Sequence, residues 1–370
     1  MSGNRKINVT RPSLPPLEDV IPYLKSIWER GILTNNGPLH QQLETALAEY
    51  LGVPYVSLFN NGTNALITAL KVFDLSGEVI TTPYSFIATA HAVSWNGLKP
   101  VFADIEPDGL NLSPAALERA ITPNTCAILP VHCYGIPCNT SAISEIASRY
   151  NLKVIYDAAH AFGVRDTEGS ILRHGDLSVL SLHATKVFNT FEGGAVISHS
   201  AKIKERVDAL RNFGFSDELN VVGIGGNGKM SELNAAVGLA QLNHIDEMLS
   251  RRSEVARKYS ESLKNIKGIK LPTGHAEHHN NSYFPIIVDE KFSLTRDQLY
   301  TKLQEHGIYA RRYFYPVICD FLPYKHASGA ETVQRARIMA SHILCLPIYP
   351  DIEDNDINSI IQKITEYQLE

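Results

Sequence analysis

Three polar features of this chain lie at places where a buried strand is expected to end. Asp157 follows the apolar run Lys153–Tyr156, and Lys186 comes soon after the run Leu177–Ser181. Residues 61–64 (Asn-Gly-Thr-Asn) lie between a predicted strand and a predicted helix. Ligands of open α/β sheets bind outside the carboxyl ends of the strands. We therefore expect an acid, an amine and a turn with free N–H groups to share one site.

Each of these features also has an ordinary structural explanation. Asp157 can be the cap of the next helical turn, and a lysine is usually a solvated surface charge. Lys186, however, lies between small residues after a buried strand, where desolvation favours the neutral amine that forms a Schiff base. The turn can be a plain N-cap, but Gly62 permits close backbone approach and Thr63 adds a hydroxyl group, so the turn also suits an anion.

The combination of the three features favours a specific cofactor. A phosphate cradle, a carboxylate and a lysine at strand ends are what pyridoxal 5'-phosphate needs. The cradle anchors the phosphate, the acid keeps the pyridine nitrogen protonated, and the lysine holds and releases the aldehyde. The residues therefore predict a pyridoxal-phosphate enzyme.

The elements that must position these residues alternate along the chain. Strands are expected at residues 55–59, 78–82, 100–104, 126–131, 153–156 and 177–181, and helices at 17–30, 39–51, 64–72, 86–95, 114–121 and 140–150. This alternation predicts βαβ units and a mainly parallel sheet. After a strand at 195–198, longer helical stretches and short strands such as 282–288 follow. We expect a large domain over residues 1–240 and a smaller α+β domain over residues 241–370.

Length and composition narrow the class of protein. The 370 residues suggest about two to three folding units. The net charge of −5 (34 Lys and Arg against 39 Asp and Glu) gives no support for a nucleic-acid partner. No apolar run approaches the ~20 residues of a membrane span, and Met1–Thr10 has no signal-peptide core. Five scattered cysteines argue against a disulfide framework, so we expect a cytoplasmic location.

One glycine-rich stretch imitates two nucleotide-binding motifs. Gly223–Gly228 fits G-x-G-x-x-G, and with Lys229 it fits most of a P-loop, but Met230 stands where Ser or Thr should hold Mg²⁺. A continuous helical pattern over Glu232–Leu249 follows, instead of the second strand of a dinucleotide-binding unit. The loop can still offer N–H groups to a phosphate. We expect no metal site, because pairs such as His278–His279 lack ligand spacing and are expected at the surface.

Longer motifs follow one another in the order of a known family. They are residues 33–38 (Leu-Thr-Asn-Asn-Gly-Pro), 61–66 (Asn-Gly-Thr-Asn-Ala-Leu), 83–89 (Pro-Tyr-Ser-Phe-Ile-Ala-Thr), 157–160 (Asp-Ala-Ala-His), 181–186, 192–194 (Glu-Gly-Gly), 227–230 and 346–350. In these motifs the sequence resembles the DegT-type sugar aminotransferases, which are fold-type-I pyridoxal-phosphate enzymes. The resemblance implies an α/β fold like that of aspartate aminotransferase, with a large domain built on a mainly parallel sheet and a smaller α+β C-terminal domain.

The resemblance also implies a role for each matching residue. Lys186 would bind the cofactor aldehyde, and Asp157 would pair with the pyridinium nitrogen. His160 would lie near the phenolic oxygen of the cofactor, and Phe86 would stack on its ring. The phosphate would be bound by Gly62, Thr63 and Ser181, and by Asn227 contributed from the second subunit of a homodimer.

The substrate side is implied by the same resemblance. Lys229 stands where the family usually has an arginine, which removes bidentate geometry. Arg312 and Tyr315 belong to a segment, 311–316, that resembles the lining of a sugar-nucleotide entrance, and its charges would suit a pyrophosphate; a solvated basic turn is the alternative. The implied reaction moves an amino group from glutamate to a nucleotide-linked keto sugar. Its implied form converts dTDP-4-keto-6-deoxyglucose to dTDP-4-amino-4,6-dideoxyglucose.

Three alternatives remain open on the sequence. The first is a 3-keto-sugar aminotransferase, and the second is a sugar dehydratase of the same fold. The third is a non-catalytic sensor that binds pyridoxal phosphate. Dehydratases of the family replace the lysine with histidine, so Lys186 favours transamination, and no segment typical of DNA binding accompanies the motifs.

Overall fold

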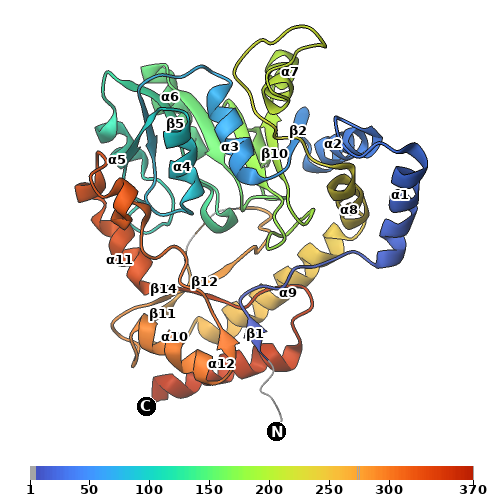
Figure 1. Ribbon diagram of the computed structural model, residues 1–370. Coiled ribbons are helices and arrows are strands. Elements are labelled where there is room, and N and C mark those ends of the chain that lie inside the picture. Colours follow the sequence, from blue (N-terminus) through green and yellow to red (C-terminus); the bar gives the residue numbers. More distant parts are fainter. Residues whose placement is uncertain (1–5, 273, 275, 370) are drawn as a thin grey trace.

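The computed structural model describes residues 6–272, 274 and 276–369, and its centre is a seven-stranded sheet (Figure 1). The strands are β2 (Tyr55–Phe59), β3 (Glu78–Thr81), β4 (Lys99–Phe102), β5 (Thr125–Leu129), β6 (Lys153–Asp157), β9 (Leu177–Ser181) and β10 (Gly194–Ser198). Their order is β2-β10-β9-β6-β5-β3-β4. Only β10 runs antiparallel to its neighbours, β2 and β9. The mainly parallel α/β sheet expected from the sequence is confirmed.

Helices cover both faces of this sheet. They are α1 (Leu17–Arg30), α2 (Pro38–Leu51), α3 (Gly62–Lys71), α4 (Ala88–Trp95), α5 (Pro114–Ala120), α6 (Thr140–Tyr150), α7 (Ala201–Arg211) and α8 (Glu232–Leu242). Successive side chains of a strand point to opposite faces. Leu180 accordingly joins the core packed against α2, whereas Val179 joins the core packed against α3. The sheet is therefore buried on both sides, as parallel sheets are.

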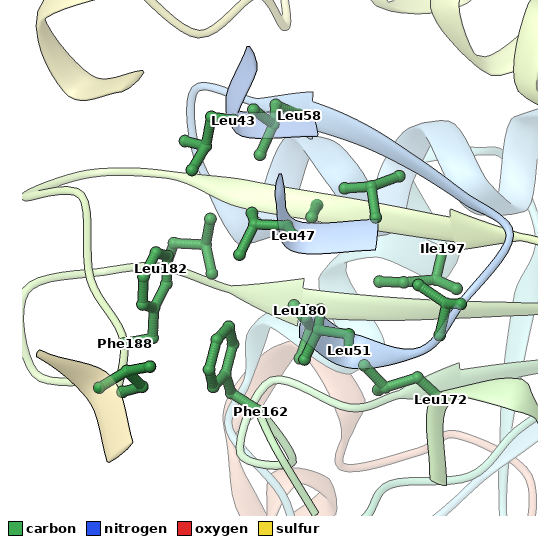
Figure 2. Close-up of a cluster of buried hydrophobic side chains, with 14 of the residues drawn as sticks. Leu43, Leu47, Leu51, Leu58, Phe162, Leu172, Leu180, Leu182, Phe188 and Ile197 are labelled. Atoms are coloured by element: carbon green, nitrogen blue, oxygen red, sulfur yellow. The ribbon is translucent and has the colours of Figure 1, made fainter. Parts of the chain in front are cut away.

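The α2 face shows how the helix spacing builds a core. Leu43, Leu47 and Leu51 recur every four residues, so they form one stripe along the helix. Figure 2 shows these leucines facing the side chains of the strands, among them Leu180 and Ile197. The same stripe is almost fully excluded from solvent. This packing fixes the sheet whose strand ends carry the polar residues of interest.

The C-terminal part forms a second lobe, drawn below the large sheet in Figure 1. Its elements are α9 (Ile245–Leu263), β11 (Ile269–Lys270), β12 (Phe284–Val288), α10 (Arg296–Glu305), β13 (Ile308–Tyr309), α11 (Gln334–His342), β14 (Ile343–Leu346) and α12 (Asp354–Leu369). The sheet order is β11-β12-β14. Strand β1 (Ile7–Asn8) pairs with β13, so the start of the described chain packs in this lobe.

The boundary between the lobes stays a prediction. Helix α9 contributes Met248 to the core beside α2 and Val255 to the core of the second lobe. The remaining short elements are β7 (Arg165–Asp166), β8 (Gly169–Ser170) and the 3₁₀ turns η1 (Cys133–Gly135), η2 (Ile171–Arg173), η3 (Ile318–Asp320), η4 (Leu322–Tyr324) and η5 (Ala330–Thr332). No helix within the described residues is long and apolar enough to cross a membrane.

Two local predictions were wrong. The helix expected over Glu232–Leu249 is broken at Asn243–His244, between the end of α8 and the start of α9. The apolar spacing continues across the break, so the pattern alone could not report it. At the break, Nε2 of His244 forms a hydrogen bond with Oδ2 of Asp19 on α1, at 2.6 Å. His279 is also not a surface residue: it is partly buried and contacts Asn281, whereas its neighbour His278 is exposed.

Candidate active site

A cavity of about 370 Å³ lies at the carboxyl ends of the central strands. Seven of the residues singled out from the sequence line it: Gly62, Thr63, Phe86, Asp157, His160, Ser181 and Lys186. The second lobe closes the cavity with Tyr283, Arg311, Tyr313 and Phe314. Because β6 and β9 are adjacent and parallel, their last residues, Asp157 and Ser181, reach the same edge of the sheet. The topology therefore brings the acid, the amine and the turn together.

One wall of the cavity is the N-terminus of α3. The side chain of Asn61 caps the helix by accepting the N–H of Asn64 at 2.8 Å. The N–H groups of Gly62 and Thr63 lie in the first turn of the helix, where no carbonyl of the same helix can accept their hydrogen bonds. A Cβ atom at position 62 would lie 3.1 Å from the Cβ of Ser181, so only glycine fits without movement. Two free N–H groups and two hydroxyls thus form a cradle suited to a phosphate.

Asp157 forms the buried acidic end of the cavity. One carboxylate oxygen accepts a hydrogen bond from Thr89 Oγ1 at 2.8 Å, and the other accepts the N–H of Ala159 at 3.1 Å. Burial raises the pKa of Asp157, while these two hydrogen bonds and the nearby charge of Lys186 oppose the rise. A cationic partner in the cavity would stabilise the ionised form further.

Lys186 stands on the loop between β9 and β10. Burial lowers the pKa of its ammonium group to about 8, although Asp157 opposes this shift. The Nζ atom lies 5.9 Å from the centre of the Tyr283 ring. A lysine with such a pKa carries a sizeable neutral fraction near neutral pH, which makes it a competent nucleophile and base.

His160 is held in one protonation state by its surroundings. Its Nδ1 accepts the backbone N–H of Tyr134 at 3.1 Å, so the ring proton resides on Nε2. Burial and the charge of Lys186 lower the pKa of His160 well below its ordinary value. The ring stacks on Phe314 with centroids 5.8 Å apart. His160 therefore offers the cavity a neutral N–H donor.

Two of the predicted residues, Asn227 and Lys229, line neither this cavity nor the pocket beside it. Asn227 is exposed, and its carbonyl accepts the side chain of Asn60 at 3.2 Å. Lys229 donates to Asn212 at 2.8 Å and lines a different pocket. The family resemblance implied that Asn227 acts in the site of a second subunit, and that role stays a prediction.

The predicted substrate residues line a neighbouring pocket of about 320 Å³. Arg312 and Tyr315 lie there, and Arg311 lines both this pocket and the main cavity. Arg312 is engaged with Asp297 at 2.9 Å. Phe86, 60% exposed, stands where the two cavities meet. The adjoining pocket thus combines cationic and aromatic side chains beside the reactive residues.

Several site residues were not identified from the sequence. Thr89 lies in a quoted motif, but only its contact with Asp157 reveals a role. Tyr283 comes from the second lobe and reaches the cavity only through folding. No spacing rule connects it to Lys186, about 100 residues earlier, so local patterns could not have found it. Phe314 lies in the segment 311–316 that the resemblance pointed to, but no role was assigned to it individually.

The arrangement fits pyridoxal 5'-phosphate. The phosphate cradle, Asp157 and Lys186 line a single cavity, and each offers the group that its part of the cofactor needs. His160 adds a neutral donor and Phe86 a flat apolar surface at the edge. The residues that one subunit supplies therefore match the main groups of the cofactor.

Comparison with known proteins places the chain among sugar-modifying enzymes. The model of the DegT/DnrJ/EryC1/StrS aminotransferase family matches residues 17–365. The chain is 57% identical over 364 residues to dTDP-4-amino-4,6-dideoxy-D-glucose transaminase of Shigella dysenteriae, covering 98% of this chain and 99% of that protein. It is 50% identical over 371 residues to the Escherichia coli protein of the same name, covering 99% of each.

Solved structures agree in fold. DesI, crystallised in the presence of its TDP-sugar product, superposes with a TM-score of 0.93 at 33% identity, over 99% of this chain and 93% of that one. NtdA from Bacillus subtilis, with bound cofactor PMP, gives 0.86 at 28% identity, over 96% of this chain and 82% of that one. The expected fold-type-I α/β architecture is confirmed.

Proposed function

We propose, because the chain belongs to the DegT/DnrJ/EryC1/StrS aminotransferase family, that it aminates a nucleotide-linked keto sugar with glutamate as the amino donor. The proposed acceptor is dTDP-4-keto-6-deoxyglucose, and the product is dTDP-4-amino-4,6-dideoxyglucose. The observation that carries the proposal is the convergence of Lys186, Asp157, His160 and the start of α3 on one cavity. Two relatives with 57% and 50% identity carry the name of that reaction.

The proposed cofactor is pyridoxal 5'-phosphate. When bound, it supplies an aldehyde that takes up amines and a ring that stores electrons. Gly62, Thr63 and Ser181 bind its phosphate, and Asp157 accepts a hydrogen bond from its protonated ring nitrogen. His160 would donate a hydrogen bond from Nε2–H to the phenolic oxygen, and Phe86 would cover the ring.

Lys186 performs two tasks in this proposal. It would hold the cofactor aldehyde between turnovers, and its freed Nζ would move a proton from the α-carbon of glutamate to the aldehyde carbon of the cofactor. In the second half-reaction Nζ would move a proton from that carbon to the former ketone carbon of the sugar. One amine can act first as base and then as acid because the pKa of Lys186 is near 8.

A second copy of the chain completes the proposed site. Asn227 would bind the phosphate of the partner's cofactor, and Lys229 would lie beside it. The loop that carries them also displays large apolar side chains, with Leu219 88% and Ile224 84% exposed. Apolar side chains at this level of exposure suit burial against another copy. The homodimer is therefore part of the proposal.

The nucleotide end of the substrate is proposed to enter through the adjoining pocket. Arg311 borders both cavities, and Arg312 and Tyr315 line the outer one. Arginine suits a pyrophosphate because its planar guanidinium donates two parallel hydrogen bonds. Tyr315 and Phe86 offer flat surfaces on which a base can stack. We also infer a cytoplasmic site of action, consistent with five free cysteines within the described residues.

A spectroscopic assay tests the proposal. Protein loaded with pyridoxal phosphate should lose its visible absorbance when glutamate is added and regain it with dTDP-4-keto-6-deoxyglucose. A non-catalytic sensor would show only a shift on binding, and a dehydratase would release no amino sugar. A panel of 3-keto and 4-keto sugars linked to dTDP or UDP then identifies the acceptor; turnover of a 3-keto sugar alone would overturn the proposed substrate.

A further inference from the structure

Two buried hydroxyl groups lead to the Asp157 carboxylate. Thr89 Oγ1 lies 2.8 Å from one oxygen of Asp157, and Ser85 Oγ lies 2.8 Å from Thr89 Oγ1. The three residues are 4%, 0% and 5% exposed in the order Asp157, Thr89, Ser85. The two hydroxyl groups and the carboxylate thus form one hydrogen-bonded chain that is shielded from bulk water.

The chemistry of the groups sets the direction of the chain. An ionised carboxylate only accepts hydrogen bonds, so the Thr89 hydroxyl must donate to Asp157. The Thr89 oxygen is then the acceptor for the Ser85 hydroxyl. Ala159 N–H donates to the other carboxylate oxygen. One donor on each oxygen prevents the carboxylate from rotating, while each oxygen keeps a free lone pair.

Other threonines of the chain show that this hydroxyl is used differently. Thr45, Thr301 and Thr365 each donate to the carbonyl four residues earlier in their own helix. Such back-bonding is the usual state of a threonine within a helix. Thr89 is the second residue of α4, so the residue four positions earlier lies before the helix, and its hydroxyl reaches across to β6. This hydrogen bond ties the start of α4 to the Asp157 carboxylate.

We propose that Thr89 is a positioning residue that keeps Asp157 ionised and oriented toward the ring nitrogen of the cofactor, with Ser85 orienting Thr89. This inference rests on the proposed function, because it concerns the cofactor named there. A hydrogen bond to the ionised form favours that form, and here it offsets the effect of burial. Removing the hydroxyl should weaken the interaction that depends on the carboxylate charge and leave the phosphate cradle intact.

The test compares two ligands in Thr89→Val, which keeps the side-chain shape and loses the hydroxyl. The dissociation constant of pyridoxal phosphate should rise about 10- to 100-fold, the usual effect of one hydrogen bond to a charged group. The analogue in which C–H replaces the ring nitrogen should bind Thr89→Val and wild type alike. Thr89→Ser should restore the affinity for pyridoxal phosphate, and Ser85→Ala should cause a smaller loss.

Thr81→Val is the matched control. Thr81 on β3 is also fully buried, and its hydroxyl donates to Leu129 O at 2.7 Å, away from the cavity. It should bind both ligands as wild type does. An unchanged affinity of Thr89→Val for pyridoxal phosphate, or an equal loss for both ligands, would overturn the inference alone. Failure of wild type to bind pyridoxal phosphate would overturn the proposed function and this inference with it.

Discussion

Two clusters of charged groups that are wholly or partly buried are built in opposite ways. The cluster between α2 and α7 joins Glu44 to Arg211 at 2.7 Å and to Lys204 at 2.9 Å. His40 adds a third contact to Glu44 at 3.0 Å, and Asp208 pairs with both cations. In the cavity, by contrast, no carboxylate of the described residues pairs within 4 Å with the ammonium of Lys186.

The difference is visible in the acid–base properties. Burial by itself would raise the pKa of Glu44, but the hydrogen bond from His40 and the charges of Arg211 and Lys204 hold it well below its usual range. Burial lowers the pKa of Lys186 and raises that of Asp157, because their partners only partly offset desolvation. The charged form of Glu44 is strongly stabilised, whereas the pKa values of Lys186 and Asp157 are shifted toward the neutral forms of these groups.

This contrast indicates that the Glu44 cluster serves stability and that the cavity groups serve catalysis. Paired buried charges stabilise a fold mainly because removing one leaves another uncompensated. Groups with strongly shifted pKa values in a cavity are candidates for catalysis. Substitutions in the two clusters should therefore affect different quantities, and the predictions below test that separation.

The largest effect is expected for Lys186→Ala. Turnover should fall by at least about 1000-fold, because both the covalent attachment and the proton carrier are lost. The protein should keep its fold and lose the visible absorbance of the bound cofactor. Steady-state rates, absorbance spectra and circular dichroism measure these effects, and near-normal turnover would contradict the assignment of Lys186.

Asp157→Asn should have the next largest effect on rate. The amide keeps the shape and removes the negative charge that stabilises a protonated ring, so kcat should fall about 100-fold or more. The phosphate cradle is untouched, so some cofactor should remain bound. Steady-state kinetics and the stoichiometry of bound cofactor measure these effects. An unchanged kcat would exclude the proposed role of Asp157 in keeping the ring nitrogen of the cofactor protonated.

Glu44→Gln should act on stability instead. It leaves the buried Arg211 with Asp208 as its remaining ionic partner and should lower the free energy of unfolding by about 3 kcal/mol. The kcat of the folded protein should change less than about threefold. Urea unfolding checks the first value and kinetics the second. Glu261→Gln, which removes the exposed pair with Arg257, is the control and should cost less than about 1 kcal/mol.

The smallest effect is a pH dependence of cofactor capture. Only the neutral amine reacts, and the pKa of Lys186 is about 8 rather than the ordinary 10.5. The rate at which cofactor-free protein binds pyridoxal phosphate should rise about tenfold per pH unit below pH 8 and level off above it. Stopped-flow absorbance follows this rate. A rate that still rises steeply at about pH 9 would indicate an ordinary, solvated lysine.

Much of the large domain followed from local sequence patterns. Strand β2 and helices α1 and α6 have the ends that were expected, because apolar spacing and terminal residues coincide there. Asp157 proved to be the last residue of β6, one position further than expected. The break between α8 and α9 was missed, because it depends on packing against α1 and not on the apolar period.

The candidate site divides in the same way. Residues at strand ends and at the start of α3 were predictable, because the carboxyl edge of a parallel sheet collects them whatever the details of packing. Tyr283 was not, because it arrives from a second lobe. The direction of the Thr89 hydroxyl could not be predicted either, since its acceptor, Asp157, lies on a strand 68 residues away in the chain.

The sequence by itself determined the types of reactive group and the sheet edge that carries them. The tertiary structure alone decided their state: which carboxylate oxygen Thr89 meets, which nitrogen of His160 keeps its proton, and how far the pKa of Lys186 falls. These properties depend on desolvation and on partners distant in the chain. Such partners are set by the packing of whole elements, which residue spacing does not encode.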